Sequence, residues 1–237
     1  MIYNGFDFGP WFDTRLMTRS LLPDYDITTR TVPGTPGERF MRADLKPLSI
    51  DVTAAFRARP TDDMAAVRRL MASRLLCLKE ADLWLDDERH LGLRYKAVLT
   101  SPGELDTLWH TGEATLTFTA YDPIAYGADA QATFSGTSSL QVGGTFRTYP
   151  VVTITPGGNT STLRLTNMDT GQYVQVDQAV SASTPVVIDM AAPQATVSGS
   201  AARVTFDSDF FSLEPGANAL RVSSGTAVAR WAERYVG

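Results

Sequence analysis

Two groups of acidic side chains have the close spacing that a chemical site would require. The first group has four carboxylates within seven residues, namely Asp82, Asp86, Asp87 and Glu88. Carboxylates this close could bind a cation or act as paired carboxylates in acid–base chemistry. A hairpin turn explains the same residues, because aspartate is favoured in turns. We therefore interpret this group as a turn.

The second acidic group lies toward the C-terminus and consists of Asp207, Asp209 and Glu214. Its spacing loosely resembles a set of calcium ligands, but the glycine and the distant glutamate of an EF-hand loop are missing. We interpret these three carboxylates as a chance cluster on the surface.

Other residue types that commonly catalyse reactions are rare in this chain. The two histidines, His90 and His110, lie in no metal-ligand spacing. The one cysteine, Cys77, excludes an intramolecular disulfide, and its apolar neighbours predict a small buried side chain. Nucleophile-elbow, phosphate-loop and dinucleotide-binding motifs are missing from the sequence. The sequence therefore predicts no catalytic residues, no metal and no cofactor.

Composition narrows the class of protein further. The 237 residues suit one large domain or two modest ones, and a net charge of −5 argues against binding a phosphate backbone. No window approaches the roughly 20 apolar residues of a membrane span, and the N-terminus lacks the features of a signal peptide. We expect no nucleic-acid partner, no membrane and synthesis in a cytoplasm.

The density of charge changes near Gly127. Residues 1–127 carry 15 Lys and Arg and 18 Asp and Glu, whereas residues 128–237 carry 6 and 8. The second part is instead rich in Thr, Val, Ser and Gly, which favour strands and turns. We predict a mainly β chain with two domains, residues 1–127 and 128–237.

The first domain has one convincing helix. Apolar residues at helical spacing predict it over residues 62–78, with Thr61 as the N-cap. Alternation of polar and apolar residues predicts a strand over residues 48–56. Further strands are predicted over residues 81–85, 90–99 and 113–120. This order gives an α+β domain in which the helix covers a sheet.

An unusual segment precedes these elements, over residues 20–47. It contains two Pro-Gly steps between charged residues, which favour turns and exposure. We expect an exposed, irregular loop that has a function or makes an interaction. The candidate contact residues are Val32, Pro33, Gly34, Pro36, Gly37 and Arg39.

The second domain shows short strands joined by Gly, Asn and Pro turns, a pattern typical of a β-sandwich. The predicted strands cover residues 148–154, 163–167, 172–176, 186–189, 203–206, 219–222 and 227–236. The last of these strands could pack back against the first domain.

Aromatic side chains are distributed along both domains. We expect five of them in the cores, namely Trp84, Trp109, Phe118, Phe206 and Phe211. Trp11 and Phe12, near the N-terminus, could fill the core or contact another subunit.

The order of several motifs is similar to that of a known family. An early Pro-Gly loop precedes the first strand, and the helix runs into the strand over residues 81–85. An aromatic residue, an Asp-Pro step and a second aromatic then close the first domain. In the second domain, a proline precedes the first strand, and a Pro-Gly-x-Asn turn precedes a later strand. The motif positions are Tyr121, Asp122, Pro123, Tyr126, Pro150, Pro215, Gly216 and Asn218. The chain resembles the distal tail proteins of long-tailed, non-contractile bacteriophages.

This resemblance implies a ring-forming belt domain with one helix on a β-sheet, followed by a galectin-like β-sandwich. It implies a ring of six copies at the far end of the virion's tail, after synthesis in the host bacterial cytoplasm. The expected partners are further copies of this chain, the tail tube protein, the tail-tip hub protein and a receptor-binding protein. Residues 128–237 are barely enough for the sandwich, so we expect no inserted carbohydrate-binding module.

Two other functions stay open on the sequence. A galectin-like sandwich could itself bind carbohydrate at the host surface, although fold does not imply function. A glycoside hydrolase would need two carboxylates facing one cleft. No segment of the sequence requires such a cleft.

Overall fold

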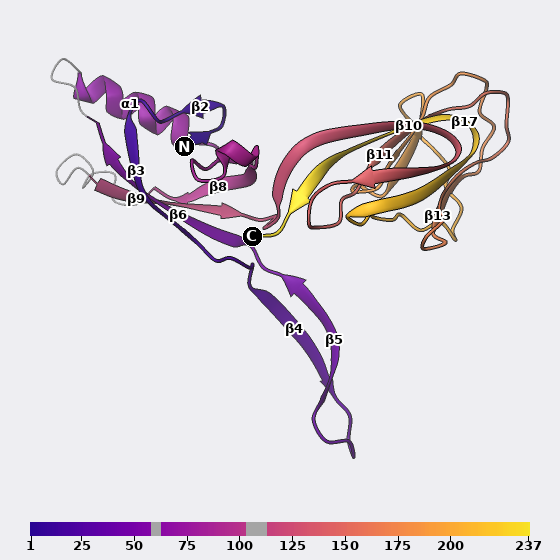
Figure 1. Cartoon of the computed structure of the whole chain (residues 1–237), viewed down its shortest axis with the longest axis horizontal. Coiled ribbons are helices and arrows are strands. Elements are labelled where there is room, and N and C mark those ends of the chain that lie inside the picture. The colour runs from indigo at the N-terminus through magenta and orange to yellow at the C-terminus, as the bar shows by residue number, and fades with distance from the viewer. Residues whose placement is uncertain (58–62, 103–112) are drawn as a thin grey trace. The chain divides into compact units, whose positions relative to one another are not determined.

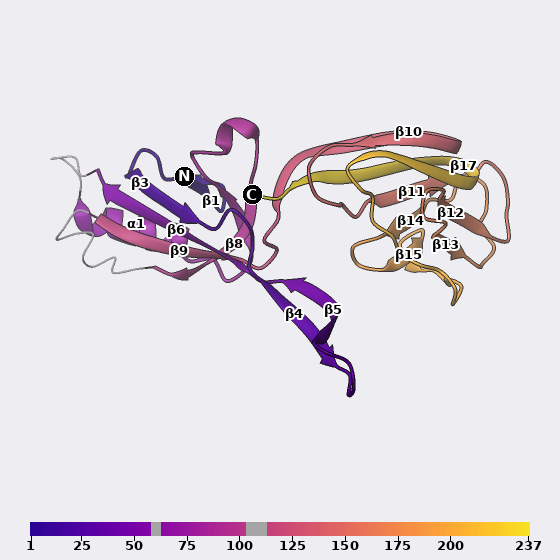
Figure 2. The same cartoon turned by 60° about the horizontal axis from the view of Figure 1, so that its bottom comes forward.

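The chain forms two units in a computed structural model, which describes residues 1–57, 63–102 and 113–237. Unit 1 contains residues 1–126 and 236–237, and unit 2 contains residues 127–235. Strands dominate both units (Figures 1 and 2), so the predicted mainly β class is confirmed. Each unit is described by itself below.

Unit 1 is built on a seven-stranded sheet in the order β2-β1-β7-β8-β9-β6-β3. The strands are β1 (Ile2–Tyr3), β2 (Phe6–Asp7), β3 (Phe12–Arg19), β6 (Leu48–Phe56), β7 (Ala81–Trp84), β8 (Tyr95–Ser101) and β9 (Glu113–Ala120). The predicted strands over residues 48–56 and 113–120 are confirmed to the residue. The prediction for residues 90–99 is wrong in its first half, because Arg89–Leu91 forms a short 3₁₀ helix (η1).

The alternation that predicted the two central strands reflects one buried face. Antiparallel pairing places Ile50 opposite Phe118 and Val52 opposite Leu116, and all four side chains are buried. Tyr3 meets the ring of Phe118 edge to face, with centroids 5.0 Å apart. Cross-strand pairs of this kind are the main source of stability in a sheet.

Helix α1 (Met64–Leu75) is shorter than the predicted helix. The Asp63 carboxylate caps it by accepting hydrogen bonds from the backbone N–H groups of Ala65 (3.0 Å) and Ala66 (3.4 Å). Its buried stripe consists of Val67, Met71 and Leu75. Leu78 continues the spacing, but its side chain is 90% exposed and lies beyond the helix, so the predicted C-terminal end is wrong. The predicted N-cap, Thr61, lies outside the described residues.

A two-stranded hairpin of β4 (Tyr25–Thr31) and β5 (Glu38–Leu45) occupies most of the predicted irregular excursion (Figure 1). The prediction of irregular structure is therefore wrong, because Ile27 and five threonines or aromatics in these strands favour the extended backbone. Pro23 and Pro47 lie at its root, where proline lacks the N–H that a ladder needs. The hairpin forms its own sheet, separate from the seven-stranded one.

Unit 2 contains an eight-stranded arrangement in the order β13-β12-β17-β11-β14-β15-β16, with β10 paired to β17. The strands are β10 (Ala125–Val142), β11 (Val151–Thr155), β12 (Leu163–Asn167), β13 (Tyr173–Val176), β14 (Val186–Asp189), β15 (Gln194–Val197), β16 (Ser200–Ala201) and β17 (Gly216–Tyr235). Four predicted strands are found here with shifts of at most three residues at an end.

Three features of unit 2 differ from what the sequence predicted. The last two predicted strands are one strand, β17, which pairs first with β12 and then with β11. Residues 203–206 form no strand, and Val204 makes a single bridge to Val176. The long strand β10 was not predicted, because small and polar residues conceal its alternation. Trp231 to Tyr235 of the closing segment belong to unit 2, while Val236 and Gly237 group with unit 1.

The predicted core aromatics have mixed outcomes. Phe118 and Phe211 are buried as expected, and Phe12 is buried against Phe8 with stacked rings 5.5 Å apart. Phe206 is fully exposed, so its prediction is wrong. The predicted core side chains that are only partly buried are Trp84 and Cys77, while Trp109 lies outside the described residues.

Candidate assembly surface

The β4–β5 hairpin has one apolar face and one charged face. Cross-strand partners share a face of the ladder, and the register pairs Tyr25 with Leu45, Ile27 with Ala43 and Thr29 with Phe40. We call this side the apolar face, and it consists of Tyr25, Ile27, Phe40, Ala43 and Leu45. The opposite face is mainly charged and consists of Asp26, Thr28, Arg30, Arg39, Arg42 and Asp44.

A register shift creates the apolar face. Between Thr28 and Thr29 the pairing slips by one residue, which leaves Met41 as the extra residue of a β-bulge. Without the slip, Phe40 would pair with Arg30 and lie on the charged face, because a shift of one residue exchanges the two faces. The bulge therefore places Phe40 beside Ile27 and Thr29.

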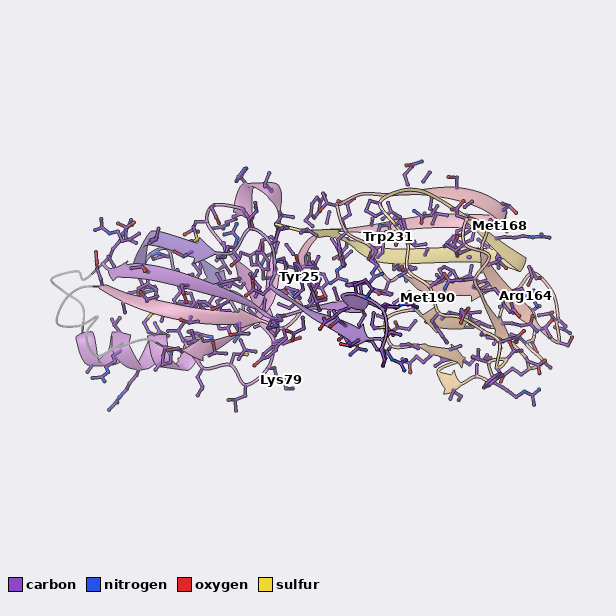
Figure 3. All side chains as sticks on the ribbon, turned by 90° about the horizontal axis from the view of Figure 1, so that it is seen from below. Tyr25, Lys79, Arg164, Met168, Met190 and Trp231 are labelled. Atoms are coloured by element: carbon purple, nitrogen blue, oxygen red, sulfur yellow. The ribbon has the colours of Figure 1, made fainter. Side chains whose placement is uncertain are left out.

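The apolar face has no cover within unit 1. Tyr25, Ile27, Phe40 and Leu45 are 46–65% exposed, and every residue of β4 and β5 is exposed. Tyr25, near the hairpin root, is labelled in Figure 3. A two-stranded hairpin without a packed face is at best marginally stable in water. Contiguous exposed apolar side chains of this kind mark interaction sites.

Ion pairs on the hairpin do not replace a core. Arg42 lies 2.8 Å from Asp44, and Lys46 lies 2.7 Å from Asp26. The four side chains are largely exposed, and exposed pairs contribute only about 0–1 kcal/mol each. These ion pairs therefore add little to the stability of the hairpin, whose apolar face stays exposed.

The structure divides the predicted contact residues between the turn and a strand. Val32, Pro33, Gly34, Pro36 and Gly37 form the turn at the tip, and Thr35 closes it with a backbone hydrogen bond to the Val32 carbonyl at 3.2 Å. Arg39 lies on β5 opposite Arg30. The sequence reasoning missed the apolar face itself.

A second exposed apolar surface of unit 1 lies at the C-terminal end of α1. It is a groove of about 510 Å³, which we call the helix-end groove. Its lining side chains include Leu75, Leu76, Cys77, Leu78, Val98 and Leu99. The exposed Leu76 and Leu78 make this a surface that another chain could cover.

The acidic group of unit 1 is neutralised by cations. Asp86 accepts a hydrogen bond of 2.6 Å from the α-amino group of Met1, and Arg94 lies 3.7 Å from Asp82. Arg19 bridges Asp87, at 2.8 Å, and Glu88. The backbone turn predicted for these residues forms after Leu85, whose carbonyl accepts hydrogen bonds from Glu88 and Arg89. These contacts give the four carboxylates a structural role.

Two pKa shifts follow from this arrangement. Burial raises the pKa of Asp86, but the hydrogen bond and charge of the α-amino group outweigh burial and lower that pKa below its ordinary value. Burial and the nearby Glu88 carboxylate raise the pKa of Tyr95 to about 12. Tyr95 therefore keeps its proton in the folded unit at a pH at which an unfolded tyrosine would ionise.

Replacing Tyr95 by phenylalanine should flatten the alkaline pH dependence of stability. An unfolded tyrosine ionises near pH 10 and the folded one near 12, so the native state binds more protons between these values. The stability that Tyr95 contributes is present below about pH 10 and is lost as the pH rises to about 12. We expect the free energy of unfolding to fall by about 3 kcal/mol over this range. Urea unfolding across pH 9–12 measures this fall.

The control for this variant is Tyr121→Phe, an exposed tyrosine of the same unit. It is expected to leave the pH dependence as in the wild type. An identical alkaline loss in the Tyr95→Phe and wild-type proteins would show that Tyr95 does not cause it.

The acidic group of unit 2 does not act as one site. The Tyr173 hydroxyl donates to Asp207, and this hydrogen bond lowers the pKa of Asp207. Glu214 belongs to another turn, in which the Asn218 amide donates to the Glu214 carbonyl at 2.7 Å. Within the described ranges, no three His, Cys, Asp or Glu side chains are placed to hold a metal ion.

The motif positions serve turns and strand ends. The Tyr126 hydroxyl donates to Asp122 at 2.5 Å, and the Tyr126 backbone pairs with Arg94. Pro123 is buried and Tyr121 is exposed at this break between β9 and β10. In unit 2, the buried Asn218 holds the Pro215-Gly216 turn, and the Pro150 carbonyl accepts from Met190 at 3.2 Å. None of these contacts tests a role in assembly.

Among the described residues, no histidine belongs to a group that could hold a metal ion. His90 is exposed in η1, and His110 lies outside the described residues. No helix in the part of the chain that the structure describes is long and apolar enough to cross a membrane.

Comparisons with known proteins agree with the fold. Residues 9–120 match the phage tail protein RIFT-related domain, and residues 143–235 match the siphovirus-type tail component, C-terminal domain. The crystal structure of the SPP1 Dit protein, described as a paradigm of the hub adsorption apparatus in phages that infect Gram-positive bacteria, is similar with a TM-score of 0.78 and 15% identity over 98% of this chain and 97% of that one.

A component of the phage p2 baseplate, in its activated conformation with Sr, is also similar. Its TM-score is 0.51 and its identity is 8%, over 94% of this chain and 91% of that one. No curated protein sequence matches this chain.

Proposed function

Because the chain belongs to the distal tail proteins of siphophages, a family of structural tail components, we propose that six copies form a ring at the distal end of the tail. The ring would join the tail tube protein to the tail-tip hub protein and to a receptor-binding protein. In this proposal residues 1–127 build the ring, and residues 128–237 form the galectin-like domain.

The observation that carries the proposal is the uncovered apolar face of the hairpin. A ring of identical subunits uses heterologous contacts, in which two different surfaces of one chain meet on neighbouring copies. Unit 1 presents the apolar face and the helix-end groove as two such surfaces. The charged face of the hairpin then sets the register between neighbouring subunits more than it adds to their affinity.

Deletion of residues 32–39 tests the ring. The deletion joins Thr31 directly to Phe40, so the turn that closes the hairpin is lost and the apolar face cannot keep its geometry. We expect the full chain to scatter light as about six times its 25.8 kDa mass, and the deletion variant as a folded monomer.

Circular dichroism supplies the control, since the seven-stranded sheet pairs without the hairpin and should keep its signal. A deletion variant that still assembles into the full ring would rule out the hairpin as the subunit contact.

A further inference from the structure

Unit 2 carries a hollow beside β17, which is lined by the exposed Arg230 and by the buried Trp231 of that strand. The hollow has a volume of about 500 Å³, within the range of sites for small ligands. Three strand regions supply its polar side chains: β10 provides Asp129 and Gln131, β17 provides Arg230, and Tyr149 precedes β11.

The polar side chains converge because the strands hold them in register. Val151 pairs with Arg230, so side chains of β11 and β17 lie together on this face. The Arg230 guanidinium donates from Nε to the Gln131 side-chain oxygen at 3.4 Å, which connects β10 to the same face.

Hydrogen bonds hold the backbone on either side of Tyr149. Tyr149 lies between Thr148, whose hydroxyl donates to the Ala232 carbonyl at 2.8 Å, and Pro150, whose carbonyl accepts from Met190. Trp231, labelled on β17 in Figure 3, is buried in the core of unit 2 and supports the strand that carries Arg230. A preformed site avoids part of the entropic cost of binding.

The residue types favour one class of ligand. One carboxylate and one guanidinium balance in charge, so the hollow has no preference for an anion or a cation. The guanidinium, amide, carboxylate and phenol offer donors and acceptors side by side. Tyr149 is 36% exposed and Val151 partly exposed, which gives an apolar surface next to the polar groups. A ligand whose hydroxyl groups lie beside an apolar face of C–H groups matches this pattern.

We infer that this hollow binds a neutral saccharide, with Arg230, Gln131 and Asp129 holding its hydroxyl groups and the ring of Tyr149 contacting its apolar side. The site would give unit 2 a binding function of its own, independent of the hairpin and of ring formation.

Saturation-transfer NMR on the full chain tests this inference. The probes are the methyl glycosides of glucose, galactose, mannose, rhamnose and N-acetylglucosamine at millimolar concentration. At least one should receive saturation from the protein. Arg230→Ala and Tyr149→Ala should each weaken its binding by about tenfold or more, whereas Tyr149→Phe should retain most of it.

Arg221→Ala is the matched control, since Arg221 is an exposed arginine of the same strand outside the hollow. It should bind the glycoside as the wild type does. The inference is overturned if none of the five glycosides binds, or if Arg230→Ala and Tyr149→Ala, shown by circular dichroism to be folded, bind as well as Arg221→Ala. Light scattering on the same samples separates this result from any failure of the ring.

Discussion

An Ile27→Asp variant is expected to remain folded but to lose the ring. Ile27 lies in the middle of the apolar face, between Tyr25 and Thr29 and opposite Ala43. Covering its exposed surface contributes about 1–2 kcal/mol at each contact, and placing a carboxylate in an apolar interface costs several kcal/mol more. Together these terms weaken each contact by more than about 100-fold. Light scattering and sedimentation should therefore show monomers at concentrations at which the wild type is assembled.

The matched control for this variant is Thr28→Asp, one residue along the same strand. Thr28 points to the charged face and pairs with Arg42, so a new carboxylate there stays in water beside a cation. It should assemble as the wild type does. If both variants assemble, or if both fail equally, the division of the hairpin into two faces does not determine assembly.

A Gly225→Ala variant is expected to destabilise unit 2 by about 4 kcal/mol. Gly225 lies in β17 between the segment that pairs with β12 and the segment that pairs with β11. Its φ is +82°, and an added Cβ would lie 2.0 Å from the Thr155 carbonyl oxygen and 2.7 Å from the Pro156 Cα. The cost combines a left-handed backbone of about 1–2 kcal/mol with a backbone clash that costs about 1–3 kcal/mol or more.

Gly199→Ala separates these two costs. Gly199 has nearly the same φ, +81°, but no atom lies within 4 Å of the added Cβ. We expect it to lose only about 1 kcal/mol, with urea unfolding followed by circular dichroism as the measurement for both variants. Equal losses of unfolding free energy in the two variants would mean that the backbone at Thr155 moves away from the added Cβ with no loss of stability.

Sequence reasoning succeeded where one periodic pattern acts alone. The strands over residues 48–56 and 113–120 alternate cleanly, because each has one face in the core and one in water. It failed at the end of α1, where Leu78 continues the helical spacing without being buried. It also failed for β10, whose small and polar residues conceal the alternation, and for β17, where Gly225 with a φ of +82° separates the segments that pair with β12 and β11.

The sequence located the segment that carries the candidate assembly surface, but it did not predict the apolar face. The Pro-Gly steps correctly indicated an exposed turn at residues 32–37. The apolar residues that flank the turn were missed, because the bulge at Met41 breaks their alternation in β5. Only the register of the two strands shows that Phe40 and Ile27 share a face. The hollow around Arg230 could not be predicted either, since it joins residues almost 100 positions apart.

The two prolines at the root of the hairpin have a consequence for how its structure depends on subunit concentration. Neither Pro23 nor Pro47 can donate a backbone hydrogen bond, so the ladder of β3 and β6 does not extend into β4 and β5. In the proposed ring, a neighbouring chain that covers the apolar face adds to the stability of the hairpin, and mass action then links its order to subunit concentration. We therefore expect dilution to loosen the hairpin before the seven-stranded sheet, and ring closure to restore it, much as a ligand orders the site that it binds.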